Sequence, residues 1–396
     1  MNADAEAVAA LPADRSEQVA FRDAALIVGC FVLSRLLLTA VGLLLLRSGP
    51  PHIASLPAAT SYAAALPDLY LRWDSFWYIG IAQQGYTTTT PPWVEAGSTA
   101  YAFYPLYPAL MWAVGELTGW SSAVAGLVVS NVSLLAALFV VYALARHWSA
   151  DRTVAALTVI LLSFAPEGFI FSAVYTESLF MLLTAGAMLA FERKQYLLAG
   201  VLAALGSASR SNGVFIALYF GLRLLRDDGL KSALHLWREP ERYLPIVMAP
   251  LGLFAFWWFA MLTTGDAFAQ KTSMVHGWHW AFDWPWSNVA HQLTGHGIRA
   301  AFLMGASLLA LLASLTLLRR DSWPLFGYCL ACFLLFWTGT LANSLLRYPI
   351  VLFPILFGLA RSLANRPVVS PALLLIFVLS DSVLMALWAV GSGLVL

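Results

Sequence analysis

Long apolar runs separated by short polar breaks recur along most of the chain. A bilayer span needs roughly 20 consecutive apolar residues, and the pattern predicts eleven such segments. They lie at residues 24–46, 122–146, 153–165, 177–192, 196–208, 213–226, 243–263, 298–319, 323–341, 348–363 and 371–394. Segment 103–119, which contains Pro105 and Pro108, fits either a span or a re-entrant piece. We therefore expect an all-α polytopic membrane protein with about 11–12 transmembrane helices.

Two pairs of the predicted segments are short and are joined by polar breaks. The breaks lie at residues 165–177 and 207–213. Irregular backbone at membrane depth is tolerated only where protein or a water-filled cavity covers it. The breaks therefore predict the wall of a cavity that opens at one membrane face.

The Lys and Arg residues predict the orientation. With the N-terminus inside and segment 103–119 not crossing, most of the 22 Lys and Arg residues face the cytoplasm, as the positive-inside rule requires. Residues 1–23 then form a cytoplasmic tail, and residues 24–396 form one transmembrane domain with long outer loops at 47–101 and 264–297. The cations left on the other side are Arg35, Arg47, Arg72, Arg210, Lys271, Arg299 and Arg347.

Composition supports a membrane protein and excludes other classes. The chain is 60% hydrophobic and only 11% charged, whereas soluble domains carry about 25% charged residues. A net charge of +1 leaves no basic face for a nucleic acid. Cys329 and Cys332 have C-x-x-C spacing but no neighbouring ligands, so we interpret them, like Cys30, as packed helix residues.

The cations on the predicted outer side are candidates for binding phosphate. Five of them flank a break or a long loop, namely Arg72, Arg210, Lys271, Arg299 and Arg347. Several cations that converge at one face suit a phosphate or pyrophosphate group, which Arg binds bidentately. The alternative explanation is snorkelling at a helix end, which we favour for Arg299.

Asp74 is the candidate catalytic carboxylate. It lies in residues 71–86, whose spacing predicts a helix along the outer membrane surface with an aromatic face. From there it could accept a proton from a sugar hydroxyl as a general base. It could instead cap that helix or pair with a surface cation. Arg72 is an unsuitable partner, because residues two apart do not face each other on a helix.

Other polar residues allow both a functional and a structural explanation. Glu177 follows Tyr175 and Thr176, so it could contact substrate or act as a favourable first-turn acid. Asp266 begins the second outer loop and fits either a substrate contact or a helix cap. That loop also holds four histidines beside Asp283, and their spacing matches no compact metal-ligand set. They are His276, His279, His291 and His296.

Five stretches, in order along the chain, together resemble the PIG-V family of mannosyltransferases. They are residues 72–78 (RWDSFWY) with 85–86 (GY) and 102–108 (AFYPLYP), 171–180 (FSAVYTESLF), 208–213 (ASRSNG), 265–270 (GDAFAQ) and 346–354 (LRYPIVLFP). Two departures are Ser209 in place of the usual Thr and a missing Pro in the fourth stretch. The resemblance implies a GT-C glycosyltransferase fold with its catalytic acid in the first outer loop, where Asp74 matches.

The resemblance also implies an activity. Such enzymes take a sugar from a polyprenyl-phosphate donor, so we expect an inverting mannosyltransferase that moves mannose from polyprenyl-phosphate mannose to a lipid or glycolipid acceptor. The chain is short compared with the eukaryotic members, so we interpret it as a bacterial homologue in the plasma membrane, with its site facing outward. The GPI-anchor acceptor of the eukaryotic members then does not carry over. We expect no cofactor or metal, because cationic side chains can stabilise the leaving phosphate.

These arguments assign roles to particular residues. Asp74 is the predicted catalytic base, and Arg210, Arg347 and Lys271 are the predicted donor-phosphate ligands. The predicted substrate-binding residues are Arg72, Trp73, Trp77, Tyr78, Tyr104, Tyr175, Glu177, Asn212, Asp266 and Gln270. The aromatic residues among them fit interface anchoring equally well.

Two other functions remain compatible with the sequence. One is a GT-C transferase that uses another lipid-linked sugar or acts on protein. The other is a transporter or flippase of a lipid-linked sugar precursor, because transporters also use broken helices and intramembrane charge. Transporters usually place their ionisable residues near the midplane, whereas here these residues collect at one face.

Overall fold

The computed structural model describes residues 13–48, 62–91, 94–229, 237–295, 297–340 and 344–395. Within these ranges the chain is helical, and its β pairing is a single bridge between Phe282 and Gly339. Each of the eleven predicted apolar segments is mostly helical in its described residues, although several end before the predicted boundary, as 323–341 does after Phe336. The prediction of an all-α protein is confirmed.

Five helical stretches of the described chain are long and apolar enough to cross a membrane. They are Gln18–Leu46 within α2 (Ala13–Ser48), α6 (Ser122–Ser149), Pro240–Thr264 (η5, Pro240–Tyr243, α12, Leu244–Met248, and α13, Leu251–Thr264), Gly297–Leu317 (α16, Gly297–Ser314, and η6, Leu315–Leu317) and α19 (Val369–Ala389). Large apolar side chains remain exposed along them, including Leu36, Leu262, Leu309 and Leu375. Apolar surface of this extent needs lipid to cover it, so the chain is a multi-pass integral membrane protein.

The remaining core helices are shorter than a full span. They are α7 (Arg152–Ser163), α8 (Glu177–Glu192), α9 (Tyr196–Ser207), α10 (Ile216–Asp228), α17 (Trp323–Phe336) and α18 (Pro354–Leu363). The 16 residues of α8 extend about 24 Å, against a hydrocarbon core about 30 Å thick. Most of α8 is buried against α6 and α9. Because protein surrounds it, its polar ends need not meet lipid.

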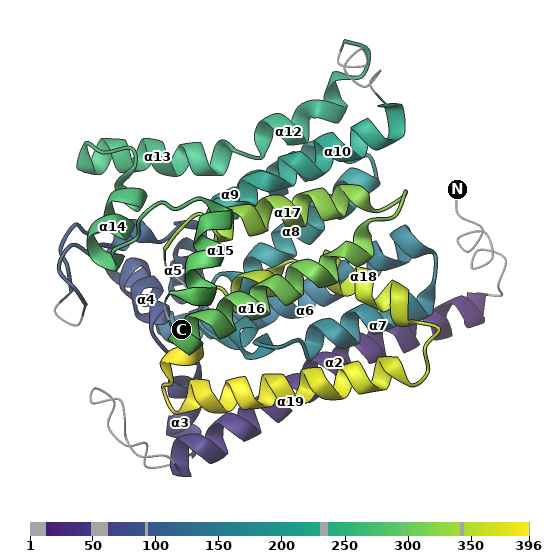
Figure 1. Ribbon diagram of the computed structural model, residues 1–396, viewed down its shortest axis with the longest axis horizontal. Coiled ribbons are helices and arrows are strands. Elements are labelled where there is room, and N and C mark those ends of the chain that lie inside the picture. The colour runs from purple at the N-terminus through teal and green to yellow at the C-terminus, as the bar shows by residue number, and fades with distance from the viewer. Residues whose placement is uncertain are drawn as a thin grey trace.

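The loop helices gather at one end of the bundle, at the left in Figure 1. They are α3 (Tyr62–Tyr70), α4 (Asp74–Gln84), α5 (Leu106–Thr118), α14 (Ala269–Trp278) and α15 (Pro285–Thr294). The first outer loop therefore carries helices, as predicted. At 13 residues α5 is shorter than a full span, as α7, α9 and α10 also are, so whether segment 103–119 crosses or re-enters stays open.

The predicted tail over residues 1–23 contains the start of the first long helix. Helix α2 already begins at Ala13, while residues 1–12 lie outside the described residues. The helix extends past its apolar run because Arg152 binds it at two points. The guanidinium lies 2.6 Å from the Asp23 carboxylate and donates to the Val19 carbonyl at 3.1 Å.

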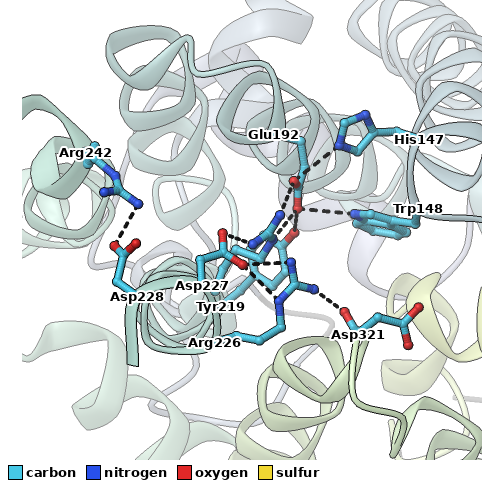
Figure 2. A network of polar contacts seen from close by, with 10 residues as sticks. His147, Trp148, Glu192, Tyr219, Arg226, Asp227, Asp228, Arg242 and Asp321 are labelled. Atoms are coloured by element: carbon cyan, nitrogen blue, oxygen red, sulfur yellow. Dashed lines mark hydrogen bonds and ion pairs between the residues drawn. The ribbon is translucent and has the colours of Figure 1, made fainter. Parts of the chain in front are cut away.

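The end of α8 opposite the loop helices carries a dense polar network (Figure 2). Its centre is the buried carboxylate of Glu192. This group accepts hydrogen bonds from Tyr219 (2.6 Å), from Arg223 (3.0 Å through both Nε and Nη2) and from the Trp148 indole (3.3 Å). His147 Nε2 lies 3.3 Å from the other carboxylate oxygen. One side chain of α8 thereby fixes the ends of α6 and α10.

The same network continues to the loop before α17. Asp227 pairs with Arg223 and with Arg226, and Arg226 donates to the carbonyl oxygen of Asp321. The Asp321 carboxylate in turn lies 2.6 Å from Arg361 of α18. Several arginines thus have structural contacts at this end. This agrees with the expectation that most Lys and Arg residues of the chain orient it in the membrane rather than bind substrate.

We expect Glu192→Gln to destabilise the protein by about 3 kcal/mol, because it leaves the partly buried Arg223 without its charge partner. Thermal melting in detergent should show a lower midpoint. Glu116→Gln, which changes an exposed carboxylate on α5, is the matched control and should melt as the wild type does. Equal melting of Glu192→Gln and wild type would contradict a central role for this carboxylate.

Candidate active site

Asp74 is the first residue of α4, and its position depends on an unusual turn. Trp73, which precedes the helix, has φ 43°, a backbone conformation that bulky residues rarely adopt. Its ring packs edge-on against Trp388 of α19, with centroids 4.6 Å apart. The Tyr175 hydroxyl donates to the Arg72 carbonyl at 3.2 Å and accepts from the Asp74 backbone N–H at 3.1 Å. Two distant segments therefore hold the turn that presents Asp74.

The Asp74 carboxylate is bound at one oxygen. Its Oδ2 accepts a hydrogen bond from Arg347 Nη1 at 3.0 Å, and the side chain is 26% exposed. Its Oδ1 has no hydrogen-bond partner within the described part of the chain. Asp74 is thus held in place while one oxygen stays available to a ligand, as a general base requires.

Glu177 is the buried centre of the site. Its Oε1 lies 2.5 Å from Arg210 Nη1 and 3.3 Å from Arg347 Nε, so two guanidinium groups share one carboxylate oxygen. The side chain is 1% exposed. A carboxylate so buried and doubly paired is unsuited to accept a proton from a substrate. It is suited to hold two like charges close together.

The two arginines come from separate parts of the chain and both lie close to one aromatic ring. Arg210 lies within the second polar break, directly before η3 (Ser211–Phe215), and Arg347 precedes η7 (Tyr348–Val351). Their Cζ atoms lie 5.6 Å and 5.8 Å from the Tyr348 ring centroid. Burial alone would lower the pKa of Arg347, but the carboxylates of Glu177 and Asp74 hold that pKa well above its ordinary value. Both arginines remain charged and converge at one point.

The first polar break lies between α7 and α8. Side chains of α2 and α19, the first and last long helices of the chain, hold it in place. Arg35 of α2 donates to the carbonyl oxygens of Gly168 (2.7 Å) and Ser163 (3.2 Å). Asp381 of α19 accepts from the Phe169 backbone N–H at 3.4 Å. A Cβ atom on Gly168 would lie 2.8 Å from Asp381 Oδ2. This clamp of Arg35 and Asp381 fixes the segment that ends in Tyr175 and Glu177.

The second polar break is fixed by close backbone packing. Gly213 lies against Gly206 and Ser207, and a Cβ atom at Gly213 would come 2.6 Å from their backbone atoms. The close approach explains why glycine ends the SNG stretch. Asn212 beside it is buried against Cys332 of α17, and its Nδ2 has no hydrogen-bond partner in the described chain.

The predicted aromatic residues pack inside the protein rather than against the membrane surface. Trp77 stacks on Phe103 at 5.4 Å and contacts Trp278 of α14 at 5.6 Å. Tyr78 packs against Tyr175, with centroids 6.2 Å apart. Burial raises the pKa of Tyr78, and the Glu177 and Asp74 carboxylates raise it further, so its hydroxyl stays protonated. Other parts of the protein thus bury these rings of α4, so they do not anchor the helix to lipid, while its position along the membrane surface stays a prediction.

Two more of the predicted substrate residues have structural contacts. The Arg72 side chain is buried and donates to the Ala389 carbonyl at the end of α19 at 3.2 Å. It does not pair with Asp74, as predicted from their spacing. Tyr104 packs against Phe256 of α13 at 5.1 Å. Neither observation excludes a substrate contact, which stays a prediction.

Lys271, Asp266 and Gln270 lie in or just before α14, and within the described residues they make no hydrogen bond or ion pair with Arg210 or Arg347. Asp266 accepts from Thr272 Oγ1 at 2.6 Å and from the Phe268 backbone N–H at 2.8 Å, so it joins the turn before α14 to the first part of that helix. Lys271 is exposed and lines a separate cavity of about 490 Å³ with Asp266. The predicted phosphate role of Lys271 gains no support from this position and stays a prediction.

The histidines of the second outer loop pair with acids singly. His291 Nδ1 lies 2.9 Å from Asp283, and His279 Nε2 lies 2.8 Å from Glu95. No group of three or more His, Cys, Asp or Glu residues with metal-binding geometry occurs in the described chain. His296 lies outside the described residues.

Three residues near the site have no role in the sequence prediction: Glu167, Asp381 and Tyr348. The sequence could have pointed to Asp381, because an acid inside an apolar span is energetically costly and marks a functional or structural site. Glu167 and Tyr348 lie in stretches that the sequence singled out, but nothing in their spacing separates them from their neighbours.

The arrangement combines a partly exposed carboxylate with two buried cations. Asp74 can accept a proton, and Arg210 and Arg347 can stabilise negative charge at a neighbouring oxygen anion. Glu177 keeps the cations in place when no anion is bound. Arg347 contacts the carboxylates of both Asp74 and Glu177, so it joins the candidate base to the anion-binding site.

Known proteins share both sequence and fold with this chain. GPI mannosyltransferase 2 of Schizosaccharomyces pombe is 29% identical over 160 residues, which are 39% of this chain and 32% of that protein. GPI mannosyltransferase 2 of Cryptococcus neoformans (strain JEC21) is 32% identical over 231 residues, 54% of this chain and 52% of that protein. The chain thus spans about half of these relatives or less.

A solved structure shows the same fold. ArnT from Cupriavidus metallidurans, in a crystal structure bound to undecaprenyl phosphate, is 15% identical with a TM-score of 0.51. The match covers 88% of this chain and 62% of ArnT. The fold is that of the GT-C glycosyltransferases, which confirms the predicted fold class.

The sequence family described as Mannosyltransferase (PIG-V) matches residues 31–286. The matched region is more than half of the chain and contains Asp74, Glu177 and Arg210, while Arg347 follows it. The chain therefore belongs to the PIG-V mannosyltransferase family.

Proposed function

We propose that this protein transfers a mannosyl group, with inversion, from polyprenyl-phosphate mannose to a hydroxyl of a lipid or glycolipid acceptor. The observation that carries the proposal is the cluster in which Arg347 binds both Asp74 and Glu177, while Arg210 binds Glu177. Glycosyl transfer from a lipid phosphate needs a base for the acceptor and positive charge for the leaving phosphate, and this cluster supplies both groups.

Asp74 acts as the base in this proposal. It is the more exposed of the two clustered carboxylates, and one of its oxygens is free among the described residues. It takes the proton of the acceptor hydroxyl while that oxygen bonds to the anomeric carbon. The bond from the anomeric carbon to the phosphate oxygen breaks on the opposite face, and polyprenyl phosphate leaves.

Arg210 and Arg347 bind the donor phosphate. A phosphate diester carries one negative charge, which becomes two on the leaving monoester. The two guanidinium groups that share Glu177 can turn toward this growing charge. Because the arginines supply the positive charge, the proposal needs no metal ion or cofactor.

The donor class draws support from known proteins. The family is one of mannosyltransferases, and ArnT of the same fold was crystallised with undecaprenyl phosphate. Undecaprenyl phosphate is the product expected of a donor with this lipid. We further propose that the site faces outward from a bacterial plasma membrane, because Arg223, Arg226 and Arg361 belong to the network at the Glu192 end of α8, whereas Glu177 begins that helix.

Asp74→Asn should lower the transfer rate by about 100-fold or more, because the amide cannot accept the acceptor proton. The assay is transfer of radiolabelled mannose from undecaprenyl-phosphate mannose to membrane lipid extract by purified protein. Asp283→Asn, which changes an acid paired only within the second loop, should transfer as wild type does. Undiminished transfer by Asp74→Asn would remove Asp74 as the base.

The same assay tests the reaction itself. If wild-type protein transfers nothing from several polyprenyl-phosphate sugars but moves a labelled lipid across vesicle membranes, it is a transporter and the proposal fails. If it transfers a different sugar, the donor sugar is wrong while the reaction class stands.

Arg347→Gln and Lys271→Gln separate the two candidate phosphate groups. Arg347→Gln should lower kcat/KM for the donor by about 100-fold, because a buried charge facing the leaving group is lost. Lys271→Gln should change it by less than about threefold, because the side chain is exposed and screened. Melting of both variants checks folding. A loss with Lys271→Gln as large as with Arg347→Gln would restore Lys271 to the phosphate site.

A further inference from the structure

Trp388 is a buried side chain near the end of α19 that neither the sequence prediction nor the proposed mechanism uses. It is 1% exposed, so its indole N–H needs a partner inside the protein. That partner is the Leu69 carbonyl oxygen in α3, at 2.7 Å. Leu69 lies in the last turn of its helix, where carbonyl groups have no partner within the helix. One side chain of α19 thus fixes the end of the segment that leads to Asp74.

The Trp388 ring also packs against both side chains that hold the turn before α4. Its centroid lies 4.6 Å from the Trp73 ring, which it meets edge-on, and 5.9 Å from the Tyr175 ring. Trp73 has the unfavourable φ of 43°, and the Tyr175 hydroxyl binds the backbone on either side of it. A conformation of this kind persists only where the surrounding structure enforces it. The packing of Trp388 therefore helps to hold the turn.

A second contact from the same helix end reaches the turn. The carbonyl oxygen of Ala389, the residue after Trp388, accepts a hydrogen bond from the Arg72 guanidinium at 3.2 Å. Arg72 is itself only 3% exposed, so water does not compete for this bond. The end of α19 thus contacts three residues of the short stretch that precedes Asp74.

We propose that Trp388 is a positioning residue for the candidate base: by fixing the turn at Trp73, it holds the Asp74 carboxylate where it can reach the acceptor hydroxyl. The inference rests on the proposed function of Asp74. Trp388 acts through the turn, because no hydrogen bond joins it to Asp74 within the described residues. A displacement of about 1 Å at a reacting group can cost about 100-fold in rate, so contacts that set this turn also set the rate.

Other contacts hold the donor-phosphate side of the site. Glu177 binds Arg210 and Arg347, and in the described part of the chain Trp388 makes no hydrogen bond to any of the three. Loss of the Trp388 contacts should therefore slow the transfer step and leave donor binding in place. A general loss of structure would weaken both, so the two effects can be told apart.

The first test is Trp388→Phe, which keeps an aromatic ring but removes the N–H that binds Leu69. We expect kcat for transfer from undecaprenyl-phosphate mannose to fall about tenfold, while the donor dissociation constant stays within about threefold of wild type. Trp148→Phe is the matched control, because that indole also donates one hydrogen bond, to Glu192 at the other end of α8. It should keep kcat within about twofold. A wild-type kcat in Trp388→Phe, or an equal loss in both variants, overturns the proposal.

A double-mutant cycle shows whether Trp388 acts through Asp74. If its effect on the rate comes from placing that carboxylate, Trp388→Phe should change the residual rate of Asp74→Asn by less than about twofold. A residue that serves only the overall stability would lower the rate of Asp74→Asn as much as it lowers that of wild type. A fully multiplicative loss in the double variant therefore rules out the positioning role.

Hydrogen exchange at the turn tests the same role without any transfer. The Asp74 and Ser75 backbone N–H groups bind the Tyr175 hydroxyl and the Arg72 carbonyl oxygen, so their exchange with solvent reports how firmly the turn is held. Trp388→Phe should speed exchange in residues 71–78 about tenfold, whereas Trp148→Phe should leave it unchanged. If wild-type protein transfers no sugar, the proposed function fails, and exchange alone then decides the role of Trp388. Equal exchange in Trp388→Phe and wild type would show that this residue does not hold the turn.

Discussion

The site depends on one buried carboxylate, Glu177, which holds Arg210 and Arg347 together. Two guanidinium groups would repel each other in a medium of low dielectric constant, and neither would be stable there alone. Glu177 removes that obstacle through a single oxygen, and Arg347 then reaches Asp74 as well. The cluster contains two carboxylates and two guanidinium groups, so its positive and negative groups are equal in number before a ligand binds. An arriving phosphate can replace carboxylate contacts without leaving an unpaired charge behind.

The rest of the fold supplies the irregular backbone that this cluster needs. Tyr175 and Glu177 lie at the end of the first polar break, and Arg210 lies within the second. In regular helices the backbone groups of those segments would hydrogen-bond to one another. Breaks in the helices instead let side chains from several helices meet at one place. The clamp of Arg35 and Asp381 joins the first and last long helices to the first break. Residues far from the chemistry thereby fix its geometry.

Sequence reasoning predicted the parts of the site that share a local pattern, but not how they combine. It found Asp74, Arg210 and Arg347 as outward polar residues at breaks, although Asp74 and Arg347 lie 273 positions apart. It could not show that Lys271 lies away from these arginines. All of these cations flank a break or a loop in the sequence, and only the packing places α14, which carries Lys271, apart from the arginine pair. It assigned the α4 aromatic face to the membrane, because an amphipathic pattern does not say whether lipid or another helix covers it.

The sequence alone determined that the chain is helical and lies in a membrane, because apolar run length and charge scarcity follow from the bilayer's thickness and low polarity. It also determined, through local motifs, which family the chain resembles. Only the tertiary structure decided which charges meet, since an ion pair depends on distances that packing sets and not on spacing along the chain. The strained Trp73 and the shared oxygen of Glu177 are both consequences of that packing.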